Sequence, residues 1–170
     1  EFLRPDEAKG TEADLEGAAM LGNRIYWIGS HGRNSKGKQR PMRQRLFATT
    51  VRETRQGLKL VPAGEPYADL LDDLFDCKAL KRFDLRDAAR RAPEEAGGLN
   101  IEGLSTTPAG ELLIGFRNPI PDGKALVVSL ANPADVVDGK ARASVGLAAE
   151  LDLGGRGIRA MEFIMATRTY

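Results

Sequence analysis

Histidine and cysteine are nearly absent, because the 170 residues include one of each, His31 and Cys77. One cysteine cannot form a disulfide within the chain, and one histidine cannot build a histidine-rich metal site. These absences exclude disulfide frameworks, zinc fingers and HExxH metalloproteases. No apolar run approaches the roughly 20 residues that span a bilayer, so we expect no membrane partner.

An excess of one charge is lacking as well, since 25 Lys and Arg residues oppose 24 Asp and Glu residues and leave a formal net charge of +1. Such a chain has no whole-molecule field that attracts nucleic acid or acidic lipid. Its charged fraction of 29% is typical of a soluble globular protein, and its length fits about one domain. The first residues are polar and acidic, so we expect no signal peptide among them. A mature secreted protein would look the same, so cytoplasm and periplasm both stay open as compartments.

The sequence does contain an internal repeat. The block Asp14–Ala18 returns as Asn100–Leu104, which sets Glu16 against Glu102 at an offset of 86 residues (102 − 16). Carried on without a gap, this offset gives two further matches: 26–29 with 112–115, and His31 with Arg117.

Each copy of the repeat predicts four short antiparallel strands, because its β-rich runs are separated by the Gly, Pro, Asn and Asp residues of tight turns. The third strands are expected at 46–51 and 125–130, and the fourth strands at 58–61 and 148–153. Two copies of four strands indicate two blades of a β-propeller. We therefore expect an all-β fold, a fragment of a β-propeller, with these parts: a tail at 1–12, a blade at 13–64, a helical insertion at 65–97, a second blade at 98–154 and the start of a third blade at 155–170.

The insertion between the blades has helical periodicity. Apolar residues recur at helical spacing from Tyr67 to Phe75, and aspartates occupy the other side. A second short helix is expected at 84–91, before Pro93. We interpret the two helices as packing on the rim of the sheets, and a lid or docking element is the alternative.

A third copy of the repeat begins at 157–161, where Arg159 takes the place of Glu102. Propellers close with about 4–8 blades, whereas this sequence supplies two and the beginning of a third. Sheet edges without a partner strand favour aggregation. We therefore expect the chain to be a piece of a longer protein or to be completed by other copies, so that remaining blades or other copies cover its edges.

Four blocks follow one another along the chain: Asp14–Gly17, Ile25–Arg33, Asn100–Leu104 and Gly154–Arg159. At these blocks the sequence resembles a bacterial family of propeller-like proteins, the domain-of-unknown-function family 3616. That family is distantly similar to phytase-like or esterase-like propellers, which share a Glu-Gly block at a strand start. The resemblance implies a propeller fold within a longer chain, and it implies no particular activity.

Glu16 and Glu102 each open the first strand of a repeat, which in a propeller lines the central channel. With Arg159 at the same place in the third copy, they would form a ring of carboxylates beside a guanidinium group. Such a ring would hold a polar ligand or, with Asp14 as a third ligand, a divalent cation such as calcium. In the alternative, structural interpretation, each glutamate accepts backbone N–H bonds from a neighbouring blade. The sequence establishes no cofactor.

His31 and Arg117 follow the second strands of the two copies. An imidazole can act as a general base, and a guanidinium group suits phosphate or carboxylate. Ser30 adds a hydroxyl, but adjacent residues of an extended chain point to opposite faces, so it is not expected to act together with the histidine. The expected ligand-binding residues are Arg33, Arg117 and Arg159.

The loop at 30–45 is basic, with six Lys and Arg residues and no acidic residue. Basic loops contact nucleic-acid phosphates, but this one lacks the aromatic residues that bind single strands. Nucleic-acid contact is therefore only a further alternative. Compensation of the loop's charge by the acidic helix expected at 69–76 is the other interpretation.

Two function classes follow from these residues. The first is a binding module for a small polar or anionic ligand, or for a protein partner, at the mouth of the propeller channel. The second is a hydrolase of phosphate or carboxyl esters, with or without a metal, whose catalytic residues would be His31, Glu16 and Glu102.

Overall fold

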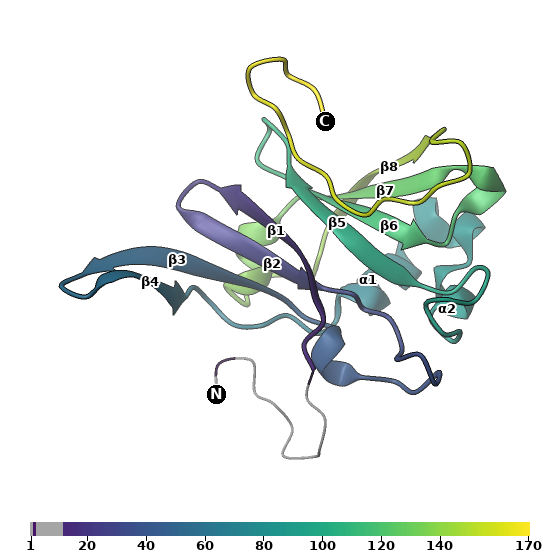
Figure 1. The fold of residues 1–170 in the computed structure, drawn as a ribbon, viewed down its shortest axis with the longest axis horizontal. Helices are drawn as coiled ribbons and strands as arrows, with labels where there is room; N and C mark the ends of the chain where they lie inside the picture. The colour runs from purple at the N-terminus through teal and green to yellow at the C-terminus, as the bar shows by residue number, and fades with distance from the viewer. Residues whose placement is uncertain (1, 3–11) are drawn as a thin grey trace.

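The computed structural model describes residue 2 and residues 12–170, and it consists mainly of two four-stranded antiparallel sheets (Figure 1). The first sheet contains β1 (Leu15–Leu21), β2 (Arg24–Gly29), β3 (Leu46–Thr54) and β4 (Gly57–Pro62) in that order. The second sheet contains β5 (Asn100–Thr106), β6 (Leu112–Asn118), β7 (Ala125–Leu130) and β8 (Val145–Leu151). The predicted all-β class and the four strands of each repeat are confirmed. Most of the tail expected at 1–12 lies outside the described residues.

The helical insertion lies between the two sheets in sequence and packs against both. It contains α1 (Leu70–Asp76), α2 (Leu85–Ala88) and the short 3-10 helix η2 (Lys78–Phe83). The apolar side of α1 is buried in the core that the two sheets share, whereas most of its aspartates lie outside that core. Three further short helices lie in loops: η1 (Pro41–Arg43), η3 (Pro121–Gly123) and α3 (Pro133–Val137). Within the described part of the chain, no helix is long and apolar enough to cross a membrane.

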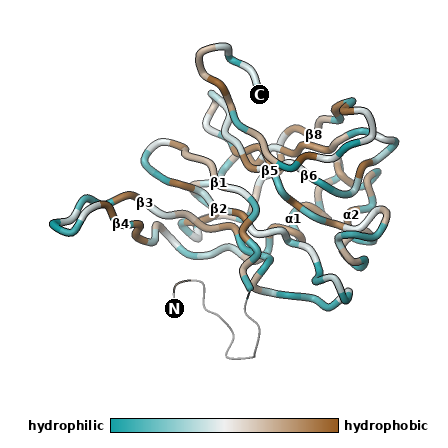
Figure 2. The backbone as a smooth tube through the Cα atoms, in the orientation of Figure 1, coloured by the Kyte–Doolittle hydropathy of each residue, from teal (hydrophilic) through white to brown (hydrophobic). Residues whose placement is uncertain are grey.

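The core forms where the two sheets face one another. Alternation along β2 buries Tyr26 and Ile28 on one face, and the second sheet contributes Ile114 and Phe116 of β6. Figure 2 shows the hydrophobic stretches on the strands and the hydrophilic stretches on the connecting loops. Burial of these apolar side chains is the main force that holds the sheets together.

The first strands of the two sheets, β1 and β5, lie side by side (Figure 1). Glycine permits this close approach, because a Cβ atom on Gly17 would lie 2.7 Å from the Cβ atom of Leu104. The ends of β1 and β5 that carry Glu16 and Glu102 therefore come together. This contact is what positions the candidate site.

The pairing of the strands corrects the gap-free alignment of the two copies by one residue. Gly17 pairs with Ile28 in the first sheet, whereas Gly103 pairs with Gly115 in the second. The cause is the longer hairpin of the second sheet, since five residues lie between the paired Thr106 and Leu112, whereas four lie between the equivalent pair Met20 and Ile25. Beyond this hairpin, Arg117 corresponds to Ser30, and the predicted match with His31 is wrong.

Residues 155–170 run along the far face of the second sheet (Figure 1). Ile158 packs on Gly103 and Gly115, and its backbone N–H donates to the carbonyl oxygen of Phe116 at 2.9 Å. In this described segment, where the start of a third blade is expected, there is no strand, and Ile164 and Thr169 form an isolated bridge. The segment therefore covers the second sheet much as the second sheet covers the first.

Candidate functional site

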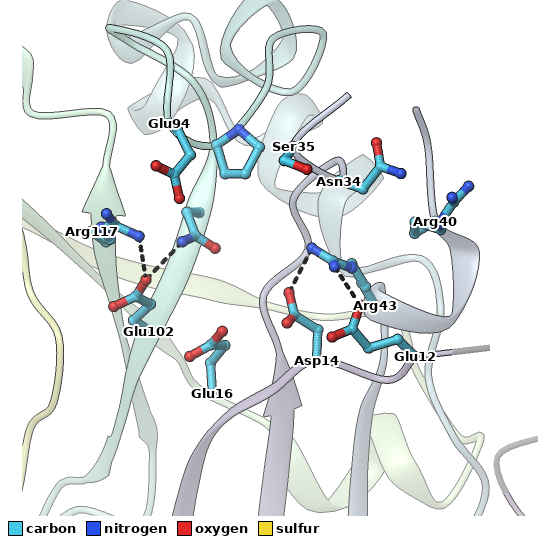
Figure 3. A pocket seen from close by; sticks show the side chains of 12 residues that line it. Glu12, Asp14, Glu16, Asn34, Ser35, Arg40, Arg43, Glu94, Glu102 and Arg117 are labelled. Carbon is cyan, nitrogen blue, oxygen red and sulfur yellow. Dashed lines mark hydrogen bonds and ion pairs between the residues drawn. The ribbon is translucent and has the colours of Figure 1, made fainter. Parts of the chain in front are cut away.

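A cavity of about 570 Å³ lies where β1 and β5 begin (Figure 3). Both repeats line it, because the equivalent residues at the starts of β1 and β5 face the same space. The loop between β2 and β3 and the loop before β5 complete the wall. The lining residues are Glu12, Asp14, Glu16, Asn34, Ser35, Arg40, Arg43, Pro93, Glu94, Asn100, Glu102 and Arg117.

Glu102 is buried, and cationic and amide donors surround its carboxylate. Arg117 Nη1 lies 3.0 Å from Glu102 Oε1, and Arg159 Nη1 lies 3.4 Å from Glu102 Oε2. The side-chain amide of Asn100 donates to Oε1 at 2.8 Å. A buried carboxylate needs such partners to offset its loss of hydration, so this side of the cavity is already neutralised.

Arg43 pairs with two carboxylates on the opposite side of the cavity. Its Nη1 lies 2.8 Å from Asp14 Oδ2, and its Nη2 lies 2.6 Å from Glu12 Oε2 (Figure 3). The arginine comes from the short helix η1, which the loop after β2 brings back toward the start of β1. One guanidinium group thus holds two carboxylates through separate nitrogen atoms.

Glu16 lies between these two ion-paired groups. Its side-chain carboxylate has no hydrogen-bond or ion-pair partner among the described residues. Burial raises the pKa of its carboxyl group, and the charges of Asp14 and Glu102 raise it further, against smaller opposing effects of Arg117 and Arg43. The repeat explains the difference from Glu102. Ser30 stands where the second copy has Arg117.

His31 lies away from the cavity wall and is 1% exposed. Burial lowers the pKa of its imidazole to about 4, so the ring is neutral at pH 7 and its Nδ1 donates to the carbonyl oxygen of Gly29 at 2.8 Å. Ser30 Oγ accepts from the backbone N–H of Gly32 at 3.3 Å. The two side chains thus make separate backbone contacts, and a catalytic role for His31 stays a prediction.

The other predicted ligand-binding residues divide between the cavity and the loop structure. Arg117 lines the cavity, and Arg159 reaches Glu102 from the last segment of the chain. Arg33 instead donates to the carbonyl oxygens of Ala89 and Gly37, at 2.9 and 3.0 Å, and fixes the basic loop against the region that follows α2.

The acidic helix α1 forms its ion pairs elsewhere than in the basic loop. Asp73 pairs with Arg142, which precedes β8, and Asp76 pairs with Arg86 of α2. Charge compensation in the basic loop comes instead from Arg43 and the two carboxylates at the cavity. Among the described residues, the ion pairs of α1 therefore do not compensate the positive charge of the basic loop.

The metal interpretation assigned Asp14, Glu16 and Glu102 as oxygen ligands. Two of these carboxylates are engaged by guanidinium groups, Asp14 by Arg43 and Glu102 by Arg117. In residue 2 and residues 12–170, no group of three or more Asp, Glu, His or Cys side chains is placed to hold a metal ion.

Eight of the twelve lining residues are not among the predicted site residues, and four of these eight are Asn34, Arg43, Glu94 and Asn100. For Asn100 the sequence carries a signal, because it stands two residues before Glu102, as Asp14 stands two residues before Glu16. The other three lie in loops, and their placement depends on how those loops fold back.

Comparisons with protein-family models and with curated proteins gave no match to this chain. The function proposed for the cavity therefore rests on its own residues and their chemistry.

Proposed function

We propose that the protein is a binding module that holds a small polar ligand in the cavity between β1 and β5. The observation that carries this proposal is the convergence of charged side chains from both repeats on one cavity of about 570 Å³. Ligand sites typically enclose roughly 300–1,000 Å³ and orient the ligand through a few polar groups. The wall here is mostly polar, which favours a hydrophilic ligand.

As part of the proposal, the two sheets are consecutive blades of a propeller of the family that the sequence resembles. Three features support it: the sequential strand order of each sheet, the side-by-side placement of β1 and β5, and the similar covering of Gly17 by Leu104 and of Gly103 by Ile158. In a propeller the cavity would lie at the mouth of the central channel. Further blades or other copies would cover the outer strands.

The hydrolase alternative has less support from the geometry. A nucleophile and its base lie within hydrogen-bond reach in most such enzymes, whereas Ser30 and His31 make separate backbone contacts. Glu16 and Glu102 line the same cavity, but Glu102 is held by two arginines.

The test uses three probes with the same four-carbon chain: 1,4-diaminobutane, 1,4-butanediol and succinate. Calorimetric titration of each probe should detect binding of at least one. Ser35→Trp should abolish it, because an indole at this exposed lining position fills the cavity. Lys36→Trp is the matched control, since Lys36 is exposed but does not line the cavity. No binding of any probe, or equal binding by the two variants, would contradict the proposal.

A further inference from the structure

The two repeat-equivalent glutamates of the cavity differ in one respect that bears on the ligand, given the proposed binding function. Glu102 receives guanidinium groups from Arg117 and Arg159. Around Glu16 the position equivalent to Arg117 is occupied by Ser30. The position equivalent to Arg159, one copy of the repeat later, is occupied by Glu102 itself. Glu16 thus occupies the repeat-equivalent position of Glu102 but has neither of the two guanidinium partners.

The charges of the lining leave a negative excess at this point. Five carboxylates and three guanidinium groups line the cavity. Arg43 is paired with Glu12 and Asp14, and Arg117 with Glu102. Glu16, Glu94 and Arg40 remain without an ion-pair partner among the described residues, and the lining as a whole keeps two more negative than positive charges. The cavity therefore favours a positively charged ligand over an anion.

Asn100 gives a second, independent indication. Its side chain lines the cavity and is only 5% exposed as a residue. The amide nitrogen is turned to Glu102, and the carbonyl oxygen Oδ1 has no hydrogen-bond partner in the described structure. Buried carbonyl groups are nearly always hydrogen-bonded, and this buried oxygen beside the cavity lacks a donor. Ammonium and guanidinium groups carry several donors and no acceptor.

We infer that the ligand is an organic cation whose ammonium or guanidinium group binds Glu16, in the way that Arg117 and Arg159 bind Glu102. The rest of such a ligand would extend toward Asn34 and Ser35, which line the cavity from the loop between β2 and β3 (Figure 3). A simple metal ion fits less well, because the described residues offer no group of three ligands.

The four-carbon probes test this inference separately from the proposed function. 1,4-Diaminobutane should bind at least about tenfold more tightly than 1,4-butanediol or succinate, since a charge-assisted hydrogen bond accounts for a factor of this order. Preferential binding of the diol or of succinate would overturn the cation while leaving the binding function intact. Binding of none of the three would overturn both.

Two variants with the same chemical change locate the charge that is responsible. Glu16→Gln should weaken diamine binding by about 10- to 100-fold, the range expected for loss of a charged partner. Glu53→Gln removes one charge from an exposed position of β3, far from the cavity lining, and should leave binding unchanged. Equal loss in both variants, or no loss in Glu16→Gln when its melting temperature is normal, would overturn the assignment of Glu16.

Discussion

Glu16 and Glu102 are the same residue at the same position of two repeats, and their surroundings give them different properties. Glu102 accepts hydrogen bonds from Arg117 and Asn100 and forms an ion pair with Arg159, so three side chains hold its carboxylate. Glu16 has no such donor, and burial raises the pKa of its carboxyl group. One glutamate therefore contributes to the fold, and the other is available to a ligand.

Stability should distinguish these two roles. Glu102→Gln should lower the free energy of unfolding by about 1–3 kcal/mol, because it removes the charge that faces two arginines. Glu16→Gln should keep or raise stability, since it removes a carboxylate whose ionised form is disfavoured. Urea unfolding at neutral pH measures both. Equal destabilisation by the two changes would contradict the difference.

His31 predicts a specific loss of stability in mild acid. Its pKa is lowered from 6.5 to about 4 by burial, so the unfolded chain takes up a proton before the folded chain does. Stability from this effect is full above about pH 6.5 and falls as the pH decreases toward 4. Between pH 6.5 and about pH 5 the loss should be about 1–2 kcal/mol.

The control is His31→Asn, because asparagine tolerates the positive φ of 55° at this position. This variant should lose less stability than the wild type over the same pH interval, as measured by urea unfolding at both ends. An identical pH dependence of the two proteins would show that another group is responsible.

At the scale of elements, the strands were predictable because turn residues separate short β-rich runs, and α1 was predictable from its apolar spacing. α3 was not predicted, since Pro133–Val137 is too short to show helical periodicity. The one-residue shift in the second strand was hidden because an ungapped match still aligned glycines and apolar residues. Of the site, the repeat indicated Glu16, Glu102 and Arg117.

The remaining site residues depend on tertiary structure. Arg43 is one of several arginines in a basic loop, and only the fold of that loop brings it to Asp14. His31 is a predicted catalytic residue of the hydrolase alternative, and the turn after β2 directs its ring into the interior, where the residue is 1% exposed. Local sequence does not specify either outcome.

The contact between β1 and β5 can be tested at Gly17. A Cβ atom there would lie 2.7 Å from the Cβ atom of Leu104, so Gly17→Ala should destabilise the protein by about 1–3 kcal/mol through overpacking. Leu104→Gly in the same chain should recover part of that loss, since glycine alone lacks the Cβ atom that clashes. Purely additive effects in the double-mutant cycle of unfolding free energies would contradict the contact.

At the scale of the whole molecule, each successive part of the chain packs on the part before it. The second sheet covers the first, and residues 155–170 cover the second. The outermost strand of the first sheet, β4, exposes Leu58 and Leu60 at 78% and 49%. Apolar side chains exposed together are typical of surfaces that another protein element covers, and this is the edge that the proposed further blades or copies would cover.

In the proposed function, the cavity between β1 and β5 binds a small polar ligand through Glu16. An NMR titration of ¹⁵N-labelled protein with 1,4-diaminobutane tests it most directly. We predict saturable shifts confined to the backbone amides of residues 12–16, 34–35 and 100–102, and their loss in Glu16→Gln. Absence of saturable shifts, or shifts spread over the acidic surface and unchanged in Glu16→Gln, would contradict it.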